Sequence, residues 1–510
     1  MRSIMTIGVK WIREHFVSVY LIAVFSGLPL YLHDKLYDIS AAKFSYIVYV
    51  TLSFFIMWLL VENRHLKDIL RRGWEKKDIL YGIFLFCAVI STAICDYPAK
   101  AFTGSAGRNL GLFTCIIYAC AALMVITAGS LSDQVFFPWG LASCVVGVIG
   151  ILNHFGIDPL GFFERMYDYQ IPLFMSTMGN VDFFSGYMAF VFVFFGCLLI
   201  KEKIVWKRIS YGGVAAVAAF SVSCCRADCG YIMIILFAVF GWMLADSMDE
   251  MLGFVLCICE ISTAIAVTGW MNCKVTSAIS LDGVGLLLTT SCIPAVIAAF
   301  CILLFVAGHF LNYHLMDSGS ANCHALRVKK VVELIVLILV IGGIAVFCVT
   351  NFTNLCVKGD GVLGMIFQKL KITDDFGATR GYVWRKTIEY YCKLPVKNKI
   401  FGIGPDMAIF AYDSILYVNP TVDLPAVFNN AHNELLQLLL THGLFGVLSY
   451  YGWIILSAIS MLKVRRQKTL AGACAFSVLC YLAMMQVCVN VVYLTFIPFL
   501  ILCIGKNSKI

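Results

Sequence analysis

Charged residues are scarce in this sequence. Only 13% of its 510 residues are Asp, Glu, Lys or Arg, whereas 61% are hydrophobic. A soluble protein of this length needs far more polar side chains to cover its surface, so the composition excludes a soluble globular fold. The sequence instead predicts a single membrane domain over residues 1–510, with the lipid bilayer as its solvent.

Several chemical signatures are also missing. The 22 cysteines lie mostly inside apolar runs and lack metal-site spacing, so we expect small buried hydrophobes and no bound metal. No glycine-rich phosphate-binding loop is present, which argues against ATP-driven transport, and no cofactor is expected. The net charge of +8 comes from short clusters rather than one basic face, which argues against nucleic acid as a partner.

What the sequence does have is a series of hydrophobic runs, each long enough to cross a bilayer. No small-residue cleavage site follows the first run, so we expect it to be a retained signal anchor. We predict an all-α polytopic integral membrane protein with about 14 transmembrane helices, near residues 16–32, 44–61, 79–95, 112–129, 135–154, 184–200, 209–224, 230–246, 251–271, 285–309, 331–350, 436–462, 469–486 and 488–505.

Basic clusters fall on alternate loops of this arrangement, which makes those loops cytoplasmic by the positive-inside rule. Both termini are then cytoplasmic, and segments 96–111, 155–183 and 351–435 lie outside. The clusters are Arg64, Lys67, Arg71, Arg72, Lys76 and Lys77; Lys201, Lys203, Lys207 and Arg208; Arg327, Lys329 and Lys330; and Lys463, Arg465, Arg466 and Lys468.

The segment 351–435 is predicted to be one large extracytoplasmic loop. It is much longer than most connections and contains helix-like stretches such as Val383–Tyr391, features that are typical of a functional loop. Cys356 and Cys392 both fall in it, and they would form a disulfide if the compartment is oxidising.

His432 is the strongest catalytic candidate in this loop. It lies between Asn429-Asn430, which are good helix N-cap residues, and an apolar run that begins a span. A helix N-terminus disfavours the imidazolium, so His432 should stay neutral and able to accept a proton, as a general base must. The alternative is a polar residue that only caps a membrane helix. His442 is interpreted as structural.

Three arginines near the predicted outer face are candidates for binding an anion. Arg226 lies in a very short turn between two spans, Arg380 opens a loop helix, and Arg108 precedes a span. The guanidinium group fits phosphate oxygens in two-point fashion. The alternatives are a snorkelling side chain or an ion pair with Asp228 for Arg226, surface solvation for Arg380 and an interfacial anchor for Arg108.

Glu260 is a carboxyl group in the middle of a predicted span. An acid inside the membrane is a candidate functional residue, although a protonated, hydrogen-bonded structural role is the alternative. One potential base and several cations near one membrane face, without a metal cluster, suit a lipid-linked phosphorylated substrate.

The stretch Asn430-Ala431-His432-Asn433-Glu434-Leu435-Leu436-Gln437, followed by Gly443-Leu444-Phe445-Gly446, resembles the signature of the O-antigen ligase and polymerase superfamily. Upstream, Arg380 with Trp384, and then Ile400-Phe401-Gly402-Ile403-Gly404-Pro405, are similar to that family's loop helix and its glycine-rich turn. The resemblance makes residues 376–462 the core motif region. Weaker matches are Gly107-Arg108-Asn109-Leu110-Gly111, Ser176-Thr177-Met178-Gly179-Asn180 and Cys225-Arg226-Ala227, where serine and glycine more commonly flank the arginine.

The resemblance implies a GT-C-like, metal-independent, inverting glycosyltransferase. Such an enzyme moves a glycan from undecaprenyl pyrophosphate to an acceptor hydroxyl of a glycan, lipid or protein, on the extracytoplasmic side of the bacterial cytoplasmic membrane. His432 would act on the acceptor hydroxyl, while Arg226, Arg380 and Arg108 would bind the donor pyrophosphate. Asn433, Trp384 and Glu434 would support the site.

Within the superfamily we favour a polymerase of surface polysaccharide over a ligase, because about fourteen rather than about twelve spans are predicted and the sequence is rich in cysteine. The alternative from another class is a flippase or other secondary transporter, for which charged residues at mid-depth and a pseudo-repeat would be expected. The sequence offers only Glu260 and no repeat. A catalytically inactive scaffold of an export complex is a third alternative.

Overall fold

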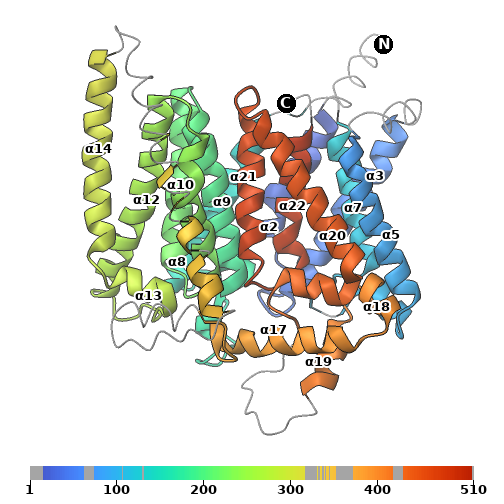
Figure 1. The fold of residues 1–510 in the computed structure, drawn as a ribbon. Helices are drawn as coiled ribbons and strands as arrows, with labels where there is room; N and C mark the ends of the chain where they lie inside the picture. Colours follow the sequence, from blue (N-terminus) through green and yellow to red (C-terminus); the bar gives the residue numbers. More distant parts are fainter. Residues whose placement is uncertain are drawn as a thin grey trace.

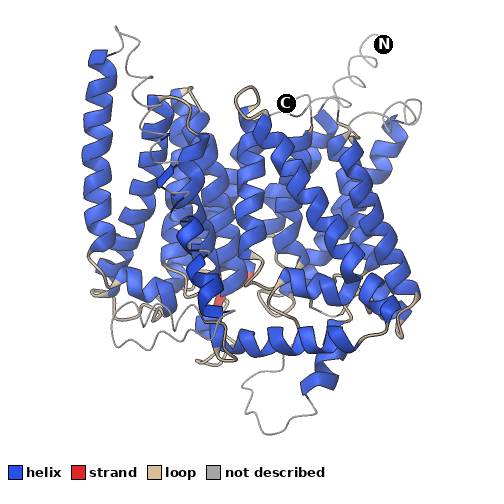
Figure 2. Ribbon diagram, in the orientation of Figure 1, coloured by secondary structure: helices blue, strands red, loops and turns tan. Residues whose placement is uncertain are grey.

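The computed structural model describes residues 15–62, 74–105, 107–128, 131, 133–315, 371–416 and 429–507, together with 330, 334–335, 338, 340–343 and 345–351. Most of these residues are helical (Figure 2). The strands β1 (Phe174–Met175) and β2 (Gly179–Asn180) form one small antiparallel pair, with Phe174 opposite Asn180. The all-α prediction is therefore confirmed for the described part of the chain.

The longer helices run side by side as a bundle (Figure 1). They are α3 (Ile39–Glu62), α5 (Ile79–Ala93), α7 (Leu112–Ile126), α8 (Phe136–His154), α9 (Val181–Lys201), α10 (Val205–Ser223), α11 (Cys229–Phe240), α12 (Met248–Asn272), α14 (Ile293–Leu315), α20 (Glu434–Lys463), α21 (Thr469–Met484) and α22 (Val492–Lys506). A further helical stretch covers His15–Leu30 and includes η1 (Ala23–Gly27) and α2 (Leu28–Leu30).

Shorter elements lie at the two ends of the bundle. They are α6 (Pro98–Thr103), α13 (Gly283–Thr289), α17 (Phe376–Lys393), α18 (Val396–Phe401) and α19 (Ala408–Leu416), with the single turns η3 (Lys76–Asp78), η4 (Asp133–Val135), η5 (Ile171–Leu173), η6 (Ser176–Met178) and η7 (Gly241–Leu244). In Figure 1, α17 lies across the lower end of the bundle rather than along it.

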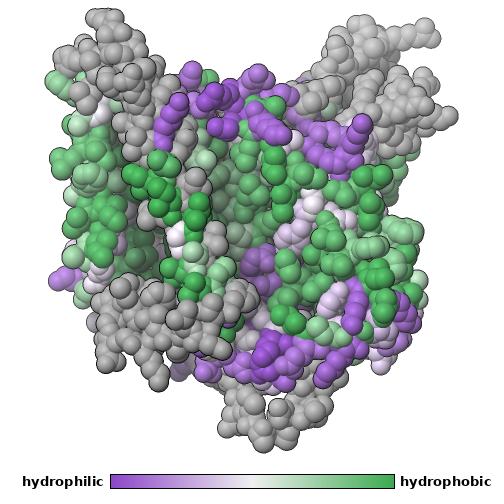
Figure 3. All heavy atoms as spheres, in the orientation of Figure 1, coloured by the Kyte–Doolittle hydropathy of each residue, from purple (hydrophilic) through white to green (hydrophobic). Residues whose placement is uncertain are grey.

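The surface of the bundle suits a membrane. Among the described residues, six helices are long and apolar enough to cross a membrane by length and composition: α3, η4 with α8, α9, α12, α14 over Ile293–Phe310, and α20. In the view of Figure 3 an apolar band separates hydrophilic residues at the upper and lower ends. The chain is therefore a multi-pass membrane protein, while the count of about fourteen spans stays a prediction.

Three predicted features can be compared with the described residues. The span predicted over 285–309 is interrupted, because α13 ends at Thr289 and α14 begins at Ile293, where Pro294 can occupy the first turn at no cost in hydrogen bonds. Within the predicted loop, residues 371–416 contain three helices, and the helix-like stretch Val383–Tyr391 is part of the longer α17. Cys356 lies outside the described residues, so its pairing with Cys392 remains a prediction.

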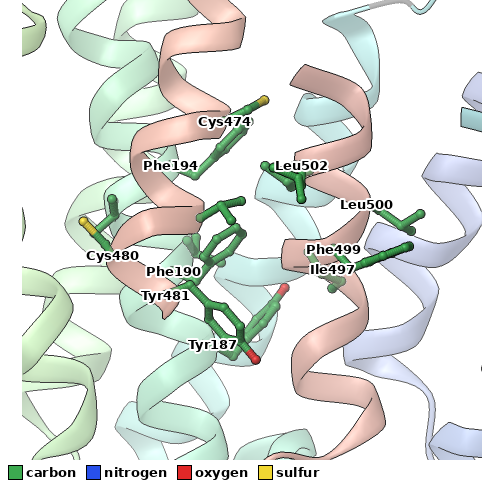
Figure 4. Packing of buried hydrophobic residues seen from close by; sticks show 14 of the residues in the cluster. Tyr187, Phe190, Phe194, Cys474, Cys480, Tyr481, Ile497, Phe499, Leu500 and Leu502 are labelled. Carbon is green, nitrogen blue, oxygen red and sulfur yellow. The ribbon is translucent and has the colours of Figure 1, made fainter. Parts of the chain in front are cut away.

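The core is centred on α9. In the apolar stretch of α9 that is long enough to cross a membrane, 94% of the residues are buried inside the protein. Tyr187, Phe190 and Phe194 of α9 face residues of α21 and α22 in Figure 4. Cys474 and Cys480 of α21 are buried free thiols, as the apolar context of most cysteines predicts.

Candidate functional site

The segment just before α20 has an unusual backbone. His432 has φ +48°, in the left-handed region that residues with a Cβ rarely adopt. The Asn430 side chain accepts a hydrogen bond from the His432 N–H at 2.8 Å, which forms an Asx turn. Strained backbone of this kind costs of order 1–3 kcal/mol and is often kept at functional sites.

Two further side chains hold the residue before His432. Trp384 of α17 donates its indole N–H to the Ala431 carbonyl at 3.0 Å, and the Gln437 side chain accepts from the Ala431 N–H at 3.1 Å. Ala431 itself is fully buried. The position of His432 is therefore fixed from α17 on one side and from the first turn of α20 on the other.

The N-cap of α20 differs from the sequence-based expectation. We predict capping from Asn429 and Asn430, but the side chain of Asn433 accepts from the Leu436 N–H at 2.9 Å, whereas Asn430 forms the Asx turn. Asn433 also donates to the Gln486 carbonyl at 2.9 Å, which joins the start of α20 to the connection between α21 and α22. The helix thus begins two residues after His432.

The His432 imidazole is held neutral. Burial is the largest cause, and the charges of Arg380 and Arg108 add to it, so that the pKa of His432 falls to about 4. The direction agrees with the sequence-based expectation of a neutral histidine, but the causes found are burial and two neighbouring arginines rather than the helix N-terminus.

Arg108 reaches the site from the loop between α6 and α7. Its guanidinium donates to the side chain of Asn429, and its Nε has no hydrogen-bond partner among the described residues. Burial lowers the pKa of Arg108, and the Asp406 carboxylate nearby opposes that shift. Arg108 is thus a partly buried cation with an unused donor, which is the state expected of a group that binds an anion.

Asp406 holds the Arg108 loop in place. One oxygen of this buried carboxylate accepts three hydrogen bonds: from Ser105 N–H at 2.7 Å, from Ser105 Oγ at 2.8 Å and from Leu110 N–H at 3.1 Å. The two segments that it joins are about 300 positions apart in the chain. Burial raises the pKa of Asp406, and these hydrogen bonds act against the rise.

Asp406 directly follows the glycine-rich turn. This turn packs against α20 at Gly443, where the helix is broken. Gly443 has φ +70° within α20, and a Cβ there would lie 2.3 Å from the Ile400 carbonyl oxygen. Gly402 has φ +87°, and a Cβ there would lie 2.2 Å from the Thr441 carbonyl oxygen. Backbone meets backbone at both positions, which explains why both are glycine.

Arg380 lies in the first turns of α17. No hydrogen bond or ion pair of its guanidinium is present among the described residues, although its charge acts on His432, Asp182 and Asp228. Arg380 therefore carries a positive charge beside His432 that no carboxylate in direct contact neutralises.

Arg226 is placed differently. It forms an ion pair with Asp282 at 2.5 Å rather than with Asp228, and both partners are partly exposed. Its charge is not among the causes that lower the pKa of His432. Asp228 accepts instead from the Val284 N–H at 2.9 Å, and burial raises its pKa. The structure thus brings Arg108 and Arg380 to His432 and leaves Arg226 in an ion pair beside α13.

Glu434, the first residue of α20, joins this helix to neighbouring segments by hydrogen bonds. Its buried carboxylate accepts from Asn490 Nδ2 at 2.9 Å and from Tyr451 OH at 3.4 Å, and its N–H donates to the Met485 carbonyl. A cavity of about 70 Å³ beneath the loop is lined by Glu434, Asp406 and His442 among others. His442 stacks on Phe84 and bonds Thr441 Oγ1 at 2.9 Å, in agreement with its structural interpretation.

Glu260 lies on α12, away from these residues. Its Oε2 is buried without a hydrogen-bond partner among the described residues. No group of three or more His, Cys, Asp or Glu side chains that could hold a metal ion occurs in the described part of the chain. The expectation of a metal-independent reaction stays a prediction.

Comparison with known protein families finds a match for part of this chain. The family model described as O-antigen ligase matches residues 276–451, which include Arg380, Trp384, the glycine-rich turn and His432. Over this segment the chain is similar to the O-antigen ligase family, which supports the resemblance to the O-antigen ligase and polymerase superfamily. No curated protein sequence matches the chain. The matched O-antigen ligase segment implies a glycosyltransferase-like enzyme.

The contacts of four polar residues around this site were not predicted from the sequence. Asp406, Asn429, Asn430 and Gln437 hold Arg108 or His432 by hydrogen bonds. The only sequence signal for Asp406 is its place directly after Gly404-Pro405, which shows a turn but not its partner. Arg108 lies outside the matched segment and is brought to it by Asp406 and Asn429.

Proposed function

We propose that this protein transfers a glycan from undecaprenyl pyrophosphate to an acceptor hydroxyl at the extracytoplasmic face of the bacterial cytoplasmic membrane. The observation that carries the proposal is the juxtaposition of a neutral His432 with the charges of Arg108 and Arg380. A base for the acceptor and cations for a departing pyrophosphate are the two parts that this reaction needs.

The residues divide between the two halves of the reaction. The acceptor oxygen forms a bond to the anomeric carbon as the bond to pyrophosphate breaks, and the acceptor proton passes to the His432 imidazole. Arg108 and Arg380 neutralise the charge that develops on the pyrophosphate, which then needs no protonating acid. Arg226 would join them only if the pyrophosphate displaced Asp282, so we assign it a lesser role. Inversion is expected for one direct displacement.

Binding of the donor would also activate the base. Burial, with a contribution from the charges of Arg380 and Arg108, lowers the pKa of His432 to about 4, which makes the imidazole a weak base. A pyrophosphate between the two arginines would cancel their charge at His432. The pKa of His432 would then rise toward physiological pH, where general-base catalysis is most effective. Proton abstraction would therefore depend on a bound donor.

Trp384, Asn433 and Glu434 act as positioning residues in this proposal. Trp384 and Asn433 fix the backbone on either side of His432, and Glu434 ties the first turn of α20 to Asn490. Between superfamily members we continue to favour a polymerase that extends surface polysaccharide.

The test is the chain length of surface glycan in cells that carry the wild type, His432→Ala or Arg380→Ala at matched protein levels. Loss of long chains, with single repeat units accumulating on the lipid carrier, would establish a polymerase. Full-length polymer left on the lipid carrier would mean a ligase. Unchanged glycan in both variants would reject the enzymatic proposal in favour of a transporter or a scaffold.

A further inference from the structure

An apolar groove with an arginine in its lining lies between α11 and α21. It has a volume of about 370 Å³. Its walls come from one stripe of each element, Leu236, Phe240, Met243 and Leu244 on α11 and η7, and Phe476, Leu479, Cys480 and Ala483 on α21. The spacing of three and four residues keeps each stripe on one helix face. Met243 is 41% exposed, so the groove opens at the surface of the bundle.

Arg465 belongs to this lining and follows the end of α20, at the end of the bundle opposite to the one that carries His432. The side chain lies against Gly472 of α21, where an added Cβ would come within 2.8 Å of the Arg465 Cβ. Its guanidinium donates to the Leu462 carbonyl at 3.2 Å and forms no ion pair among the described residues. Most of its donors are thus available at the groove.

Two other cations at this end of the bundle differ from Arg465, because carboxylates pair with them. Lys201 pairs with Asp246 at 2.9 Å and with Glu250 at 2.7 Å, and Arg466, next to Arg465 in the chain, pairs with Asp246 at 3.2 Å. Among the described residues Arg465 has no carboxylate partner, and it is the cation in the lining of the apolar groove. An anion attached to a hydrocarbon chain complements both features.

We propose that this groove binds an anionic phospholipid, with an acyl chain between α11 and α21 and the phosphate on Arg465. The guanidinium fork suits phosphate oxygens, and basic pockets between transmembrane helices are known to select anionic headgroups. Leu479 and Phe240 would contact the hydrocarbon. This site is separate from His432 and does not depend on the proposed glycosyl transfer.

The experiment measures phosphatidylglycerol binding to the full-length protein purified in detergent, by native mass spectrometry, with phosphatidylcholine as the neutral comparison. Arg465→Gln should weaken phosphatidylglycerol binding about fivefold. Arg466→Gln is the matched control, because it removes the same charge one residue away from a side chain that already has a carboxylate partner. It should bind like the wild type.

A second variant tests the apolar wall without changing charge. Ala483→Trp fills the groove and should lower phosphatidylglycerol binding while leaving Arg465 intact. Equal losses in Arg465→Gln and Arg466→Gln would show general charge attraction and overturn the proposal, as would unchanged binding in Arg465→Gln. The arginine pair decides the question even if Ala483→Trp fails to fold.

Discussion

The indole N–H of Trp384 donates to the carbonyl of Ala431 at 3.0 Å, one residue before His432. Through this bond α17, which lies across the end of the bundle, fixes a histidine that precedes a membrane helix. Trp384→Phe keeps the ring but removes the donor, at a cost of about 1 kcal/mol. We expect glycosyl transfer to slow about fivefold, with unchanged expression, in an assay of transfer by purified protein.

The control for this variant is Trp206→Phe, because Trp206 is 59% exposed and lies at the start of α10. It should leave transfer unchanged. Equal activity of the wild type and Trp384→Phe would show that this hydrogen bond does not position the histidine.

Asp406 should act through Arg108. Asp406→Ala removes three hydrogen bonds that hold Ser105 and Leu110, so the loop between α6 and α7 should lose its arrangement. We expect KM for the lipid-linked donor to rise at least tenfold. Asp406→Asn keeps an oxygen that can accept these bonds and should restore most of the donor affinity.

Asp374→Asn is the control for Asp406, since Asp374 is an exposed carboxylate paired with Arg385. An effect of Asp406→Ala on kcat alone, with donor KM unchanged, would contradict its assignment to the Arg108 loop.

The pH dependence of the reaction follows from the charges around His432. With a pKa of about 4 in the free enzyme, His432 is unprotonated at neutral pH, and kcat/KM should fall only as the pH drops toward that value. The profile of kcat reports the donor complex, where the arginines are neutralised, and its acid limb should lie at higher pH. Acid limbs at the same pH in both profiles would show that the donor does not change the basicity of His432.

Replacing one arginine tests the same electrostatics in the free enzyme. Arg380→Gln removes a positive neighbour, so the pKa of His432 should rise and the acid limb of kcat/KM should move to higher pH. Lys386→Gln is the control, because Lys386 lies on the same helix and its charge is already paired with Glu389. If the acid limb of kcat/KM in Arg380→Gln stayed at the wild-type pH, this would contradict the placement of the Arg380 charge beside His432.

Gly443 should tolerate no side chain. In Gly443→Ala the new Cβ would clash with the Ile400 carbonyl, and a φ of +70° is strained for alanine. We therefore expect the free energy of unfolding to fall by about 1–3 kcal/mol. Thermal unfolding in detergent measures it. Gly213→Ala on α10, where an added Cβ meets nothing within 4 Å, should be neutral or stabilising. Equal unfolding temperatures for the two variants would contradict the tight packing at residue 443.

The length of the hydrophobic runs was enough to predict most of the helices, because a bilayer allows few other structures for such sequences. Run length alone missed the break before Ile293, because the predicted apolar run extends over both α13 and α14. His432 and Arg380 were found through their motif. The resemblance alone could not place Arg226, since its nearest carboxylate, Asp282, depends on how α13 packs.

The remaining parts of the site depend on contacts between distant segments. Asn430 and Asn433 are equally good capping residues by type, and only the backbone at His432 decides that one forms a turn and the other the cap. Asp406 and Ser105 meet across about 300 positions, and no local pattern marks such a pair. Sequence reasoning therefore named candidate reactive groups but did not find the contacts that hold them in place.

The most direct test of the proposed function measures transfer by the purified protein in liposomes that contain an undecaprenyl-pyrophosphate-linked glycan and its acceptor. His432→Ala should lower the rate of product formation at least a hundredfold, while His33→Ala, at an exposed histidine paired with Asp38, should match the wild type. Product formation by His432→Ala at the wild-type rate would contradict the assignment of His432 as the base.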